Sequence, residues 1–451
     1  MVPDDDLALM VDLYELTMAQ AYWSRGMNET AVFSLFFRKL PEHRNFMLAC
    51  GQQHVTRVVE SLRFSDAQIE RLRSLDRFSD GFLAWLRNFR FSGSIQAMPE
   101  GTPVFPQEPL LEVEAPIAEA QILETLLMNY VHLETVLASK AVRLVIAADG
   151  RPVVDFGMRR MHGLDAAYRG VRAFRMAGLA GTSNVLAGLD FGLPIRGTMA
   201  HSFVQACDSE MDAFRTYAER FPGTTLLVDT YDTERAVAAI IRWLKSEPSM
   251  DIGAIRLDSG DFAEQAVHCR RMLDEAGLGH ISIMASGGLD EHKIDALCRS
   301  GVPLDGFGVG TSVGASSDAP SLELAYKLTE YAGRPRMKNS PGKQSFPGPK
   351  QVFRQRDADG IFLGDTITHR EETAEGEPLL VSTLRAGHRV EGALAPLADA
   401  AHHARAAVAA LPASLRTLRD GVAYPVAISD RLRRLQRETL VRVQPHYDDG
   451  C

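Results

Sequence analysis

Short apolar runs alternate with amphipathic helical patterns between about residues 150 and 311. The candidate strands are 152–156, 194–200, 224–230, 252–258, 281–286 and 305–310, and apolar residues at helical spacing predict helices over 208–220, 233–246, 261–276 and 290–300. Such strands return roughly every 25 to 45 residues, close to the repeat of a (β/α) barrel. The pattern predicts βα units in a parallel sheet or barrel.

The two flanks of this region have a different pattern. Before it, we expect a helix over 7–25, strands at 31–39, 93–105 and 109–116, helices around 65–87 and a long helix over 117–148. After it, the stretch 333–354 is rich in Gly, Pro and Lys, which predicts a loop or hairpin. Helical patterns at 390–412 and 427–442 follow. The fold class is therefore α/β, with at least two domains.

Composition and charge exclude several classes of protein. The chain has 451 residues, of which 45% are hydrophobic and 24% charged, and it contains no apolar run long enough to span a membrane. Its acidic first residues do not resemble a secretory signal, so we expect a cytoplasmic protein. A net charge of −9 without a basic stripe argues against nucleic-acid binding. The five cysteines form no CxxC pair, which favours reduced thiols over disulfides or a zinc site.

Polar residues and glycines follow every predicted strand of the barrel region. They are Arg159 and Arg160, then His201, Asp229 and Asp232, Asp258 and Asp261, the run Ser286, Gly287 and Gly288, and finally Gly308, Gly310 and Thr311. Because the carboxyl ends of barrel strands converge on one rim, where active sites are built, these residues are candidates for a single site.

Each of these segments also has a plain structural interpretation. The glycines of 286–291 and 307–312 suit a phosphate held by backbone N–H groups, but a strand-to-helix turn needs glycine anyway. In RLDSGD, 256–261, the residues could form an Arg–Asp pair and a helix cap, or could bind an anion, a ribose hydroxyl or Mg²⁺. Spacing alone leaves both interpretations open.

His201 lies among small and apolar residues in GTMAHSF, 197–203. It could be a core residue, a metal ligand or a chemical participant. A position at a strand end, with Asp229 at the next strand end able to orient the imidazole, favours the chemical role. A metal site is less favoured because no second His or Cys lies at ligand spacing.

Ten ordered motifs give the chain a recognisable resemblance. They are VDLYELTMAQAYW at 11–23, FFRKLP at 36–41, DFGMRR at 155–160, GTSNVLAG at 181–188, GTMAHS at 197–202, VDTYDT at 228–233, RLDSGD at 256–261, FGVGTS at 307–312, YKL at 326–328 and RMKNSPGKQSFPG at 336–348. In this order and spacing, the chain resembles nicotinate phosphoribosyltransferase, a type II phosphoribosyltransferase. The likeness runs from about residue 7 to the carboxyl-terminal helices.

The resemblance implies an irregular, incomplete α/β barrel joined to a smaller α/β domain built from both chain ends. We accordingly expect an N-terminal α/β domain at 1–125, a catalytic barrel at 126–332 and a carboxyl-terminal segment at 333–451 that packs with the N-terminal domain. It also implies a homodimer with shared active sites. The implied reaction joins nicotinate to phosphoribosyl pyrophosphate, gives nicotinate mononucleotide and pyrophosphate, is coupled to ATP hydrolysis, and is the first step of NAD salvage from nicotinate. Mg²⁺ is implied, without a tightly bound organic cofactor.

Residue by residue, the resemblance implies a role for most of the candidates. His201 would be phosphorylated transiently by ATP, with Asp229 as its orienting carboxylate, and Asp258 would face the ribose hydroxyls or Mg²⁺. Tyr14 of a neighbouring subunit and Phe156 would stack on the pyridine ring, while Arg256 and Ser183 would lie on the carboxylate side. The phosphate-binding set would be Arg159, Arg38, Gly287, Gly288, Gly308, Gly310, Thr311, Lys327 and Lys338.

Fewer residues bear on the substrate specificity and on the alternative functions. Related nicotinamide-using enzymes carry an acidic residue at the position of Ser183, so a neutral serine favours a carboxylate substrate. Gly287 is a departure, since many relatives have Asn there. The alternative functions are a quinolinate or nicotinamide phosphoribosyltransferase, a phosphosugar lyase or isomerase, and a non-catalytic barrel scaffold.

Overall fold

The computed structural model describes residues 4–340, 345–419 and 421–443. Within them the chain divides into two compact units, one made of 140–320 and the other of 1–139 with 321–451. Both chain ends therefore contribute to one unit, and this unit contains more residues than the barrel unit, where we expected fewer. Part of the predicted 333–354 loop, residues 341–344, lies outside the described residues, as does Cys451.

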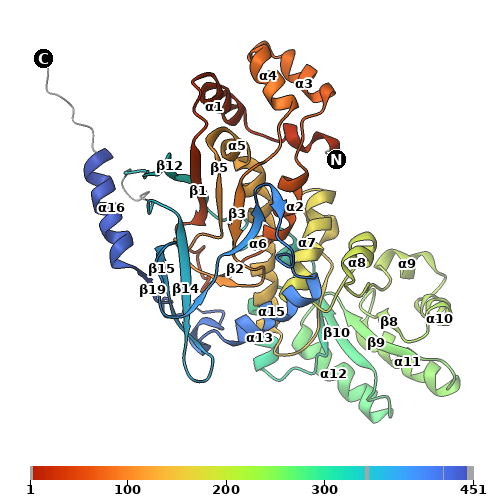
Figure 1. Ribbon diagram of the computed structural model, residues 1–451. Helices are drawn as coiled ribbons and strands as arrows, with labels where there is room; N and C mark the ends of the chain where they lie inside the picture. The colour runs from red at the N-terminus through yellow and green to blue at the C-terminus, as the bar shows by residue number, and fades with distance from the viewer. Residues whose placement is uncertain (1–3, 341–344, 420, 444–451) are drawn as a thin grey trace, which may run out of the picture. The chain divides into compact units, whose positions relative to one another are not determined.

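The unit 140–320 contains a six-stranded parallel sheet in the order β7-β6-β11-β10-β9-β8. Its strands are β6 Val153–Asp155, β7 Gly181–Thr182, β8 Thr224–Leu227, β9 Ile252–Leu257, β10 Ser282–Ser286 and β11 Gly306–Val309. The neighbouring strands are parallel in every pair, and helices lie between consecutive strands (Figure 1). Five of the six predicted strands are confirmed. The sheet is the incomplete α/β barrel that the sequence predicted.

The predicted strand at 194–200 is wrong, and β7 at 181–182 takes the place in the sheet. Pro194 lacks an N–H group, and only Ile195 forms a bridge, to Thr182 of the edge strand β7. At the opposite edge, the Thr198 hydroxyl donates a hydrogen bond to the Thr225 carbonyl of β8. Residues 194–200 therefore contact both edge strands, β7 and β8, without pairing along either of them. His201 directly follows this segment.

The helices of this unit are α7 Leu164–Ala177, α8 Val185–Phe191, α9 His201–Ala206, α10 Glu210–Arg220, α11 Thr233–Ser246, α12 Phe262–Glu275, α13 Glu291–Arg299 and α14 Thr311–Ala315, with the 3₁₀ turn η2 Met158–Arg160. Helices α10, α11, α12 and α13 follow the predicted amphipathic patterns with small shifts, and the other helices were not predicted. Side-chain caps start several of them: Asp232, Asp261 and Asp290 accept hydrogen bonds from the first turns of α11, α12 and α13.

The other unit is built on a seven-stranded sheet in the order β13-β12-β1-β5-β3-β17-β18. Its elements are β1 Thr30–Phe37, β3 Ser94–Ala97, β5 Leu111–Pro116, β12 Leu324–Tyr331, β13 Arg334–Pro335, β17 Val381–Arg385 and β18 His388–Arg389. Smaller sheets pair β2 Met47–Leu48 with β4 Pro103–Val104, and order β16 Glu377–Pro378, β14 Lys350–Arg356, β15 Phe362–His369 and β19 Val426–Ile428. Because β17 pairs with β3 and β12 pairs with β1, both chain ends share one sheet; β12 lies within 126–332, the range that we expected in the barrel.

Helices surround this sheet. They are α1 Leu13–Ser24, α2 Gln52–Ser61, α3 Asp66–Arg73, α4 Asp80–Arg87, α5 Ile117–Ile122, α6 Glu124–Ala147, α15 Leu397–Ala409 and α16 Asp430–Val443, with 3₁₀ turns at Asp4–Leu9 and Ala413–Leu415. The predicted helix 117–148 is thus two helices, interrupted at Leu123. Within the described ranges, no helix is long and apolar enough to cross a membrane.

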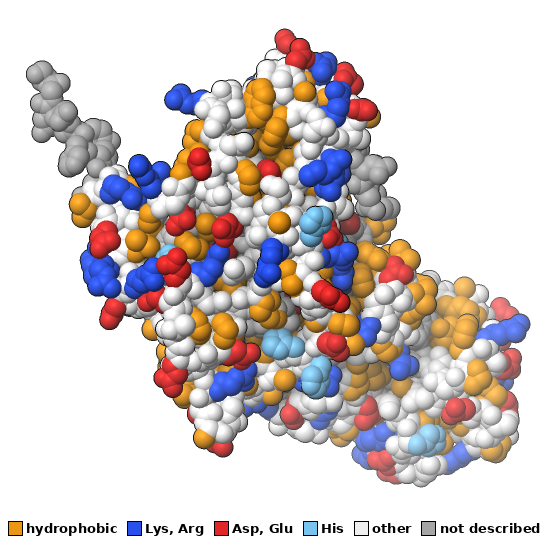
Figure 2. All heavy atoms as spheres, in the orientation of Figure 1, with side chains coloured by type: hydrophobic (Ala, Val, Ile, Leu, Met, Phe, Trp, Pro, Cys, Tyr) orange, Lys and Arg blue, Asp and Glu red, His pale blue; other side chains and the backbone are white. Residues whose placement is uncertain are grey.

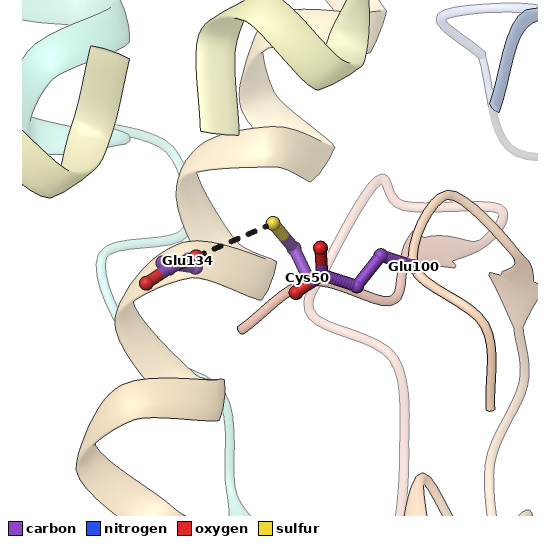
Figure 3. A group of neighbouring side chains, drawn as sticks. All are labelled: Cys50, Glu100 and Glu134. Carbon is purple, nitrogen blue, oxygen red and sulfur yellow. Dashed lines mark hydrogen bonds between the residues drawn. The ribbon is translucent and has the colours of Figure 1, made fainter. Parts of the chain in front are cut away.

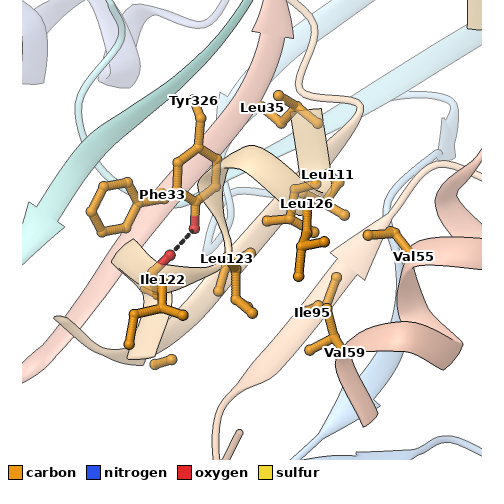
Figure 4. Close-up of a cluster of buried hydrophobic side chains, with 14 of the residues drawn as sticks. Phe33, Leu35, Val55, Val59, Ile95, Leu111, Ile122, Leu123, Leu126 and Tyr326 are labelled. Atoms are coloured by element: carbon orange, nitrogen blue, oxygen red, sulfur yellow. Dashed lines mark hydrogen bonds between the residues drawn. The ribbon is translucent and has the colours of Figure 1, made fainter. Parts of the chain in front are cut away.

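The core of this unit lies between the sheet and its helices (Figure 4). Phe33 of β1 stacks on Tyr326 of β12 with ring centroids 4.7 Å apart, and the Tyr326 hydroxyl donates to the Ala120 carbonyl of α5. A buried tyrosine needs such a partner for its hydroxyl. The contact fixes the strand that carries Lys327 against α5.

The surface combines mixed charge with one apolar helix face. On the face drawn in Figure 2, basic and acidic side chains are interspersed without a continuous basic band. Orange side chains gather over α8, where Val185, Leu186 and Leu189 are 60%, 61% and 67% exposed. Apolar side chains grouped on one exposed helix indicate a contact surface rather than a solvated face.

Candidate active site

Asp155, the last residue of β6, organises the first edge of the site. Its buried carboxylate accepts hydrogen bonds from the Gly157 N–H and the Thr182 hydroxyl, both at 2.7 Å. Burial raises the pKa of Asp155, and these two hydrogen bonds oppose the rise. The Ser183 N–H bonds to the Asp155 carbonyl at 2.9 Å. Asp155 therefore fixes the backbone on both sides of Phe156 and Ser183, a supporting role that the sequence analysis did not assign.

His201 is the first residue of α9, and its side chain is 41% exposed. Its Nδ1 lies 3.1 Å from the Thr230 hydroxyl, within hydrogen-bond distance, and its Nε2 lies 3.8 Å from Oδ2 of Asp258. Among the described residues, Asp229 makes no hydrogen bond or ion pair with His201. The orienting contact that we expected from Asp229 is made by its neighbour Thr230.

Asp229 instead supports Asp258. Its Oδ2 accepts hydrogen bonds from the Asp258 N–H at 3.0 Å and from the Ser259 hydroxyl at 2.6 Å. Its Oδ1 is buried without a hydrogen-bond partner. The Asp229 carboxylate thus holds the backbone of Asp258, and of these two residues Asp258 lines the cavity.

Arg256, on β9, is held in place from three directions. Its Nη1 donates to Asp258 and to Ser286, each at 3.2 Å, and its Nη2 donates to the Met199 carbonyl at 2.9 Å. Its Nε is buried and has no partner. Burial lowers the pKa of Arg256, while the carboxylates of Asp258 and Asp229 oppose the effect. The guanidinium is therefore fixed in orientation and keeps a donor unused.

The two glycine turns are required by close packing. A Cβ on Gly287, whose φ is +89°, would lie 1.8 Å from the Asp258 carbonyl oxygen. A Cβ on Gly308 would lie 2.4 Å from the ring of Phe156. Gly287 therefore lets its turn pack on Asp258, and Gly308 makes room for the aromatic ring. Position 287, where the resemblance shows a departure from relatives with Asn, therefore has no room for a Cβ in this backbone conformation.

Two adjoining cavities bring the predicted residues of this unit together. One, of about 530 Å³, is lined by Phe156, Met158, Arg159, Leu164, Ser183, 197–201, Arg256 and Asp258. The other, of about 380 Å³, is lined by Phe156, Arg159, Arg160, Arg256, Asp258, 286–290, Gly308, 310–312 and Ser317. Four residues, Phe156, Arg159, Arg256 and Asp258, line both. The first cavity combines an aromatic face with a cation, and the second combines arginines with glycine turns.

Four predicted residues, Tyr14, Arg38, Lys327 and Lys338, belong to the unit made from both chain ends. Burial lowers the pKa of Lys327, the carboxylate of Glu124 opposes this effect, and the positive charges of Arg38 and Lys338 lower the pKa further. Pairing of β1 with β12 explains the effect of Arg38, because Arg38 directly follows β1 and Lys327 is on β12. Arg38 Nε is buried without a partner. Like charges gathered in this way favour binding of an anion.

Tyr14 lies on α1 and is 46% exposed. Burial of part of the side chain, followed by the carboxylates of Glu124 and Glu15, raises the pKa of Tyr14. Glu15 itself is buried, and this burial raises its pKa to about 8 although Thr125 donates two hydrogen bonds to it. The phenol therefore stays protonated and its ring presents an open face at neutral pH.

Two polar residues near the barrel site, Thr230 and Glu210, were not among the predicted site residues. Thr230 contacts His201. Glu210, the first residue of α10, has a pKa raised to about 7 by burial and by the charges of Asp232 and Asp229. Thr230 ends a predicted strand, a signal that could have identified it, and the same signal placed Ser286, which contacts both Arg256 and Asp258, among the candidates. Glu210 had no such signal, because a carboxylate at a helix start is common.

A separate buried cluster, Cys50, Glu100 and Glu134, lies outside the barrel unit (Figure 3). Its potential ligand atoms lie within 4.8 Å of one another. Glu100 accepts hydrogen bonds from the N–H groups of Gly51 and Gln53 at the start of α2, and Glu134 lies 3.0 Å from Nδ1 of His54. The Cys50 thiol is 3.6 Å from Glu134. These contacts explain the carboxylates by a structural role.

Comparison with known proteins identifies the family of the chain. Residues 9–132 match the N-terminal domain of nicotinate phosphoribosyltransferase (NAPRTase), and residues 152–345 match the NAPRTase family. The chain is 51% identical to nicotinate phosphoribosyltransferase pncB2 of Mycobacterium tuberculosis over 94% of this chain and 92% of that protein. The chain belongs to the nicotinate phosphoribosyltransferase family.

Two further relatives extend this result. The nicotinate phosphoribosyltransferase of Bacillus subtilis is 40% identical over 78% of this chain and 74% of its own length. The crystal structure of human nicotinic acid phosphoribosyltransferase superposes with a TM-score of 0.84 at 29% identity, covering 95% of this chain and 99% of the human chain. Family membership therefore covers both units of the chain.

Proposed function

We propose that this protein condenses nicotinate with phosphoribosyl pyrophosphate, coupled to ATP hydrolysis through a transient phosphohistidine at His201. The observation that carries the proposal is the cavity that combines Phe156, Arg256, Asp258 and His201 in a member of the nicotinate phosphoribosyltransferase family. An aromatic face, a fixed guanidinium and a carboxylate are the groups that a pyridine carboxylate and a phosphoribosyl group require.

Arg256 supports recognition of the nicotinate carboxylate. Its Nη1 and Nη2 make three hydrogen bonds, so two of the five N–H groups of the guanidinium, Nε and one on Nη2, have no partner among the described residues. A carboxylate beside Arg256 would accept from the guanidinium, whereas an amide would offer one acceptor and two further donors. Ser183 lines the same cavity and is neutral, so it does not repel the substrate's charge. Both residues favour nicotinate over nicotinamide.

The bond change itself needs no general base. The pyridine nitrogen attacks C1 of the ribose with its lone pair, the C1–O bond to pyrophosphate breaks, and pyrophosphate leaves with that electron pair. The positive charge that develops on the ribose and the negative charge on the leaving group must be stabilised. Arg159 and the turns at 287–288 and 308–311 suit the phosphates. The cations Arg38, Lys327 and Lys338 belong to the other unit and would suit an anion as well.

Asp258 fits the Mg²⁺ that the family implies. Its Oδ1 is engaged by Arg256 and Ser286, whereas Oδ2 faces His201 at 3.8 Å and the side chain is 33% exposed in the cavity wall. One carboxylate that shares the ion with substrate phosphates is a common Mg²⁺ arrangement. When bound, Mg²⁺ would neutralise charge on the departing pyrophosphate.

We assign His201 to energy coupling. A ring nitrogen would take the γ-phosphoryl group of ATP with release of ADP, and water would later cleave the P–N bond to give phosphate and free His201. The imidazole is accessible at 41% exposure and is oriented by Thr230, which suits a phosphoryl acceptor. The added negative charge beside Asp258 would change how the loops hold the substrates.

We also propose a homodimer in which Tyr14 of one subunit completes the site of the other. The apolar face of α8 with Val185, Leu186 and Leu189 suits burial against a second copy. Tyr14 is half exposed, as are its neighbours Met10 and Leu13. Mixing Tyr14→Ala subunits with Phe156→Ala subunits tests the idea, because a shared site predicts partial recovery of activity in the mixed dimer.

Substrate competition provides the main test of the function. Nicotinate, nicotinamide and quinolinate are offered in turn with phosphoribosyl pyrophosphate and Mg²⁺, with and without ATP. We expect nicotinate mononucleotide from nicotinate, with stimulation by ATP and incorporation of γ-phosphate. Product from nicotinamide or quinolinate alone would replace the proposed substrate, and no product from any of the three would favour a non-catalytic scaffold.

A further inference from the structure

Ser286 ends β10 and is 2% exposed. Its hydroxyl donates to Oδ1 of Asp258 and accepts a hydrogen bond from Nη1 of Arg256 at 3.2 Å. Arg256 Nη1 also contacts Oδ1 of Asp258 directly at 3.2 Å. The three groups thus form a closed triangle in which Ser286 contacts both charged partners.

The triangle determines which atoms of Arg256 and Asp258 remain for ligands. On Asp258, Oδ1 receives two donors, so Oδ2 is the oxygen left toward His201. On Arg256, the five N–H donors make two hydrogen bonds from Nη1 and one from Nη2, so the buried Nε and one N–H of Nη2 are left among the described residues. A hydroxyl has one proton, so Ser286 donates to Asp258 in preference to the Leu257 carbonyl 3.5 Å away, and its lone pair accepts from Arg256.

The backbone of the same turn reinforces this arrangement. Gly287 packs so closely on the Asp258 carbonyl oxygen that a Cβ would lie 1.8 Å from it. The Asp258 N–H is held by Asp229 at 3.0 Å. The side chain of Asp258 is therefore the part that can still rotate, and Ser286 is the residue that restrains it from the neighbouring strand.

We propose that Ser286 is a positioning residue that couples the nicotinate side of the site, at Arg256, to the phosphoribosyl side, at Asp258. The inference rests on the proposed function. When the nicotinate carboxylate accepts hydrogen bonds from Arg256, the guanidinium moves. The hydrogen bonds that Ser286 makes to both residues transmit this movement to the carboxylate of Asp258. Binding of one substrate then prepares the site for the other, which is a positive coupling between the two.

The test compares Ser286→Ala with Ser286→Thr, which keeps the hydroxyl, and with Ser282→Ala, a matched control four residues earlier on β10. The KM for nicotinate is measured at low and at saturating phosphoribosyl pyrophosphate. The KM at the low concentration divided by the KM at saturation reports the coupling. We expect Ser286→Ala to reduce this ratio by about 10-fold, the scale of one hydrogen bond to a charged group. Ser286→Thr and Ser282→Ala should keep the ratio of the unmodified protein.

A double-mutant cycle with Asp258→Asn separates positioning from a general structural effect. If Ser286 acts through Asp258, the two substitutions together should cost little more in kcat/KM than Asp258→Asn alone. Independent, additive losses would overturn the proposal, as would an unchanged ratio in Ser286→Ala or the absence of coupling in the unmodified protein. Ser286→Cys provides a second variant of similar volume, should the alanine variant fold poorly. Failure of the unmodified protein to make nicotinate mononucleotide would instead contradict the proposed function.

Discussion

The Thr230 hydroxyl lies 3.1 Å from Nδ1 of His201, while the preceding residue, Asp229, turns to the backbone of Asp258. Thr230 and Asp229, two adjacent residues that follow β8, thus contact two different partners. One orients the imidazole, and the other fixes the loop that carries the acidic side chain of the cavity. Thr230 therefore acts on the residue proposed for ATP coupling, and Asp229 acts on the residue proposed for the phosphoribosyl group.

Thr230→Val should impair ATP coupling selectively. Valine keeps the branched shape of threonine but removes the hydroxyl that contacts Nδ1, so the imidazole loses this orienting contact. We expect γ-phosphate labelling of His201 and the stimulation by ATP to fall about 10-fold. Synthesis without ATP should be unaffected, and Thr230→Ser should behave as the unmodified protein. Full labelling in the valine variant would show that Thr230 does not position the ring.

Gly287→Ala should disturb Asp258 through a steric clash. The added Cβ would meet the Asp258 carbonyl oxygen at 1.8 Å, in addition to the strain of φ at +89°. We expect a loss of about 1–3 kcal/mol in stability and more than 10-fold in kcat/KM for phosphoribosyl pyrophosphate. Gly301→Ala is the matched control, because Gly301 also has a positive φ, +67°, but open space around it. Equal effects of the two substitutions on activity would exclude the clash as the cause.

Glu15 should make stability depend on pH. Burial raises its pKa to about 8 in the folded protein, whereas an unfolded glutamate titrates near 4.3. Between these values the folded state binds more protons, so stability should fall as pH rises from about 5 to 8 and then level off. Denaturant titrations at several pH values should show a flatter profile for Glu15→Gln, and Glu29→Gln, at an exposed position, serves as the control. An identical profile in Glu15→Gln would contradict the assignment.

Glu210 should give activity a pH dependence near neutrality. Its pKa is raised to about 7 by burial and by Asp232 and Asp229. As pH rises through 7 the carboxyl group ionises and places a further negative charge beside Asp229, which supports Asp258. We expect kcat/KM for phosphoribosyl pyrophosphate to change between pH 6 and 8, and Glu210→Gln to flatten that change. Glu219→Gln, exposed on the same helix, should keep the original profile.

The elements themselves could be predicted well from the sequence. The helix α11, Thr233–Ser246, was predicted to the residue, and the strands around 153, 225, 255, 284 and 307 were located. These elements carry a continuous apolar pattern bounded by capping residues or glycine, and such signals are local. The segment 194–200 misled the analysis because its apolar residues look like a strand, although it bridges two sheet edges without pairing along either.

The residues of the candidate site could be predicted from the sequence, but the hydrogen bonds between them could not. Strand ends on a barrel rim identified Arg256, Asp258 and His201, because the rim of a parallel sheet collects them wherever the strands lie, and the family resemblance added Phe156. The partner of each side chain could not be predicted. Ser286 and Arg256 are 30 residues apart, and their contact depends on the register of β10 against β9.

By itself, the sequence determined the family, the parallel barrel sheet and the residues that chemistry would require, because periodicity, glycine turns and ordered motifs are properties of the chain. Only the tertiary structure decided that Thr230 contacts His201, that Asp229 supports Asp258 and that Ser286 joins Asp258 to Arg256. The physical reason is that hydrogen bonds between side chains require atoms within about 3 Å, and strand register, rotamer and close packing set those distances.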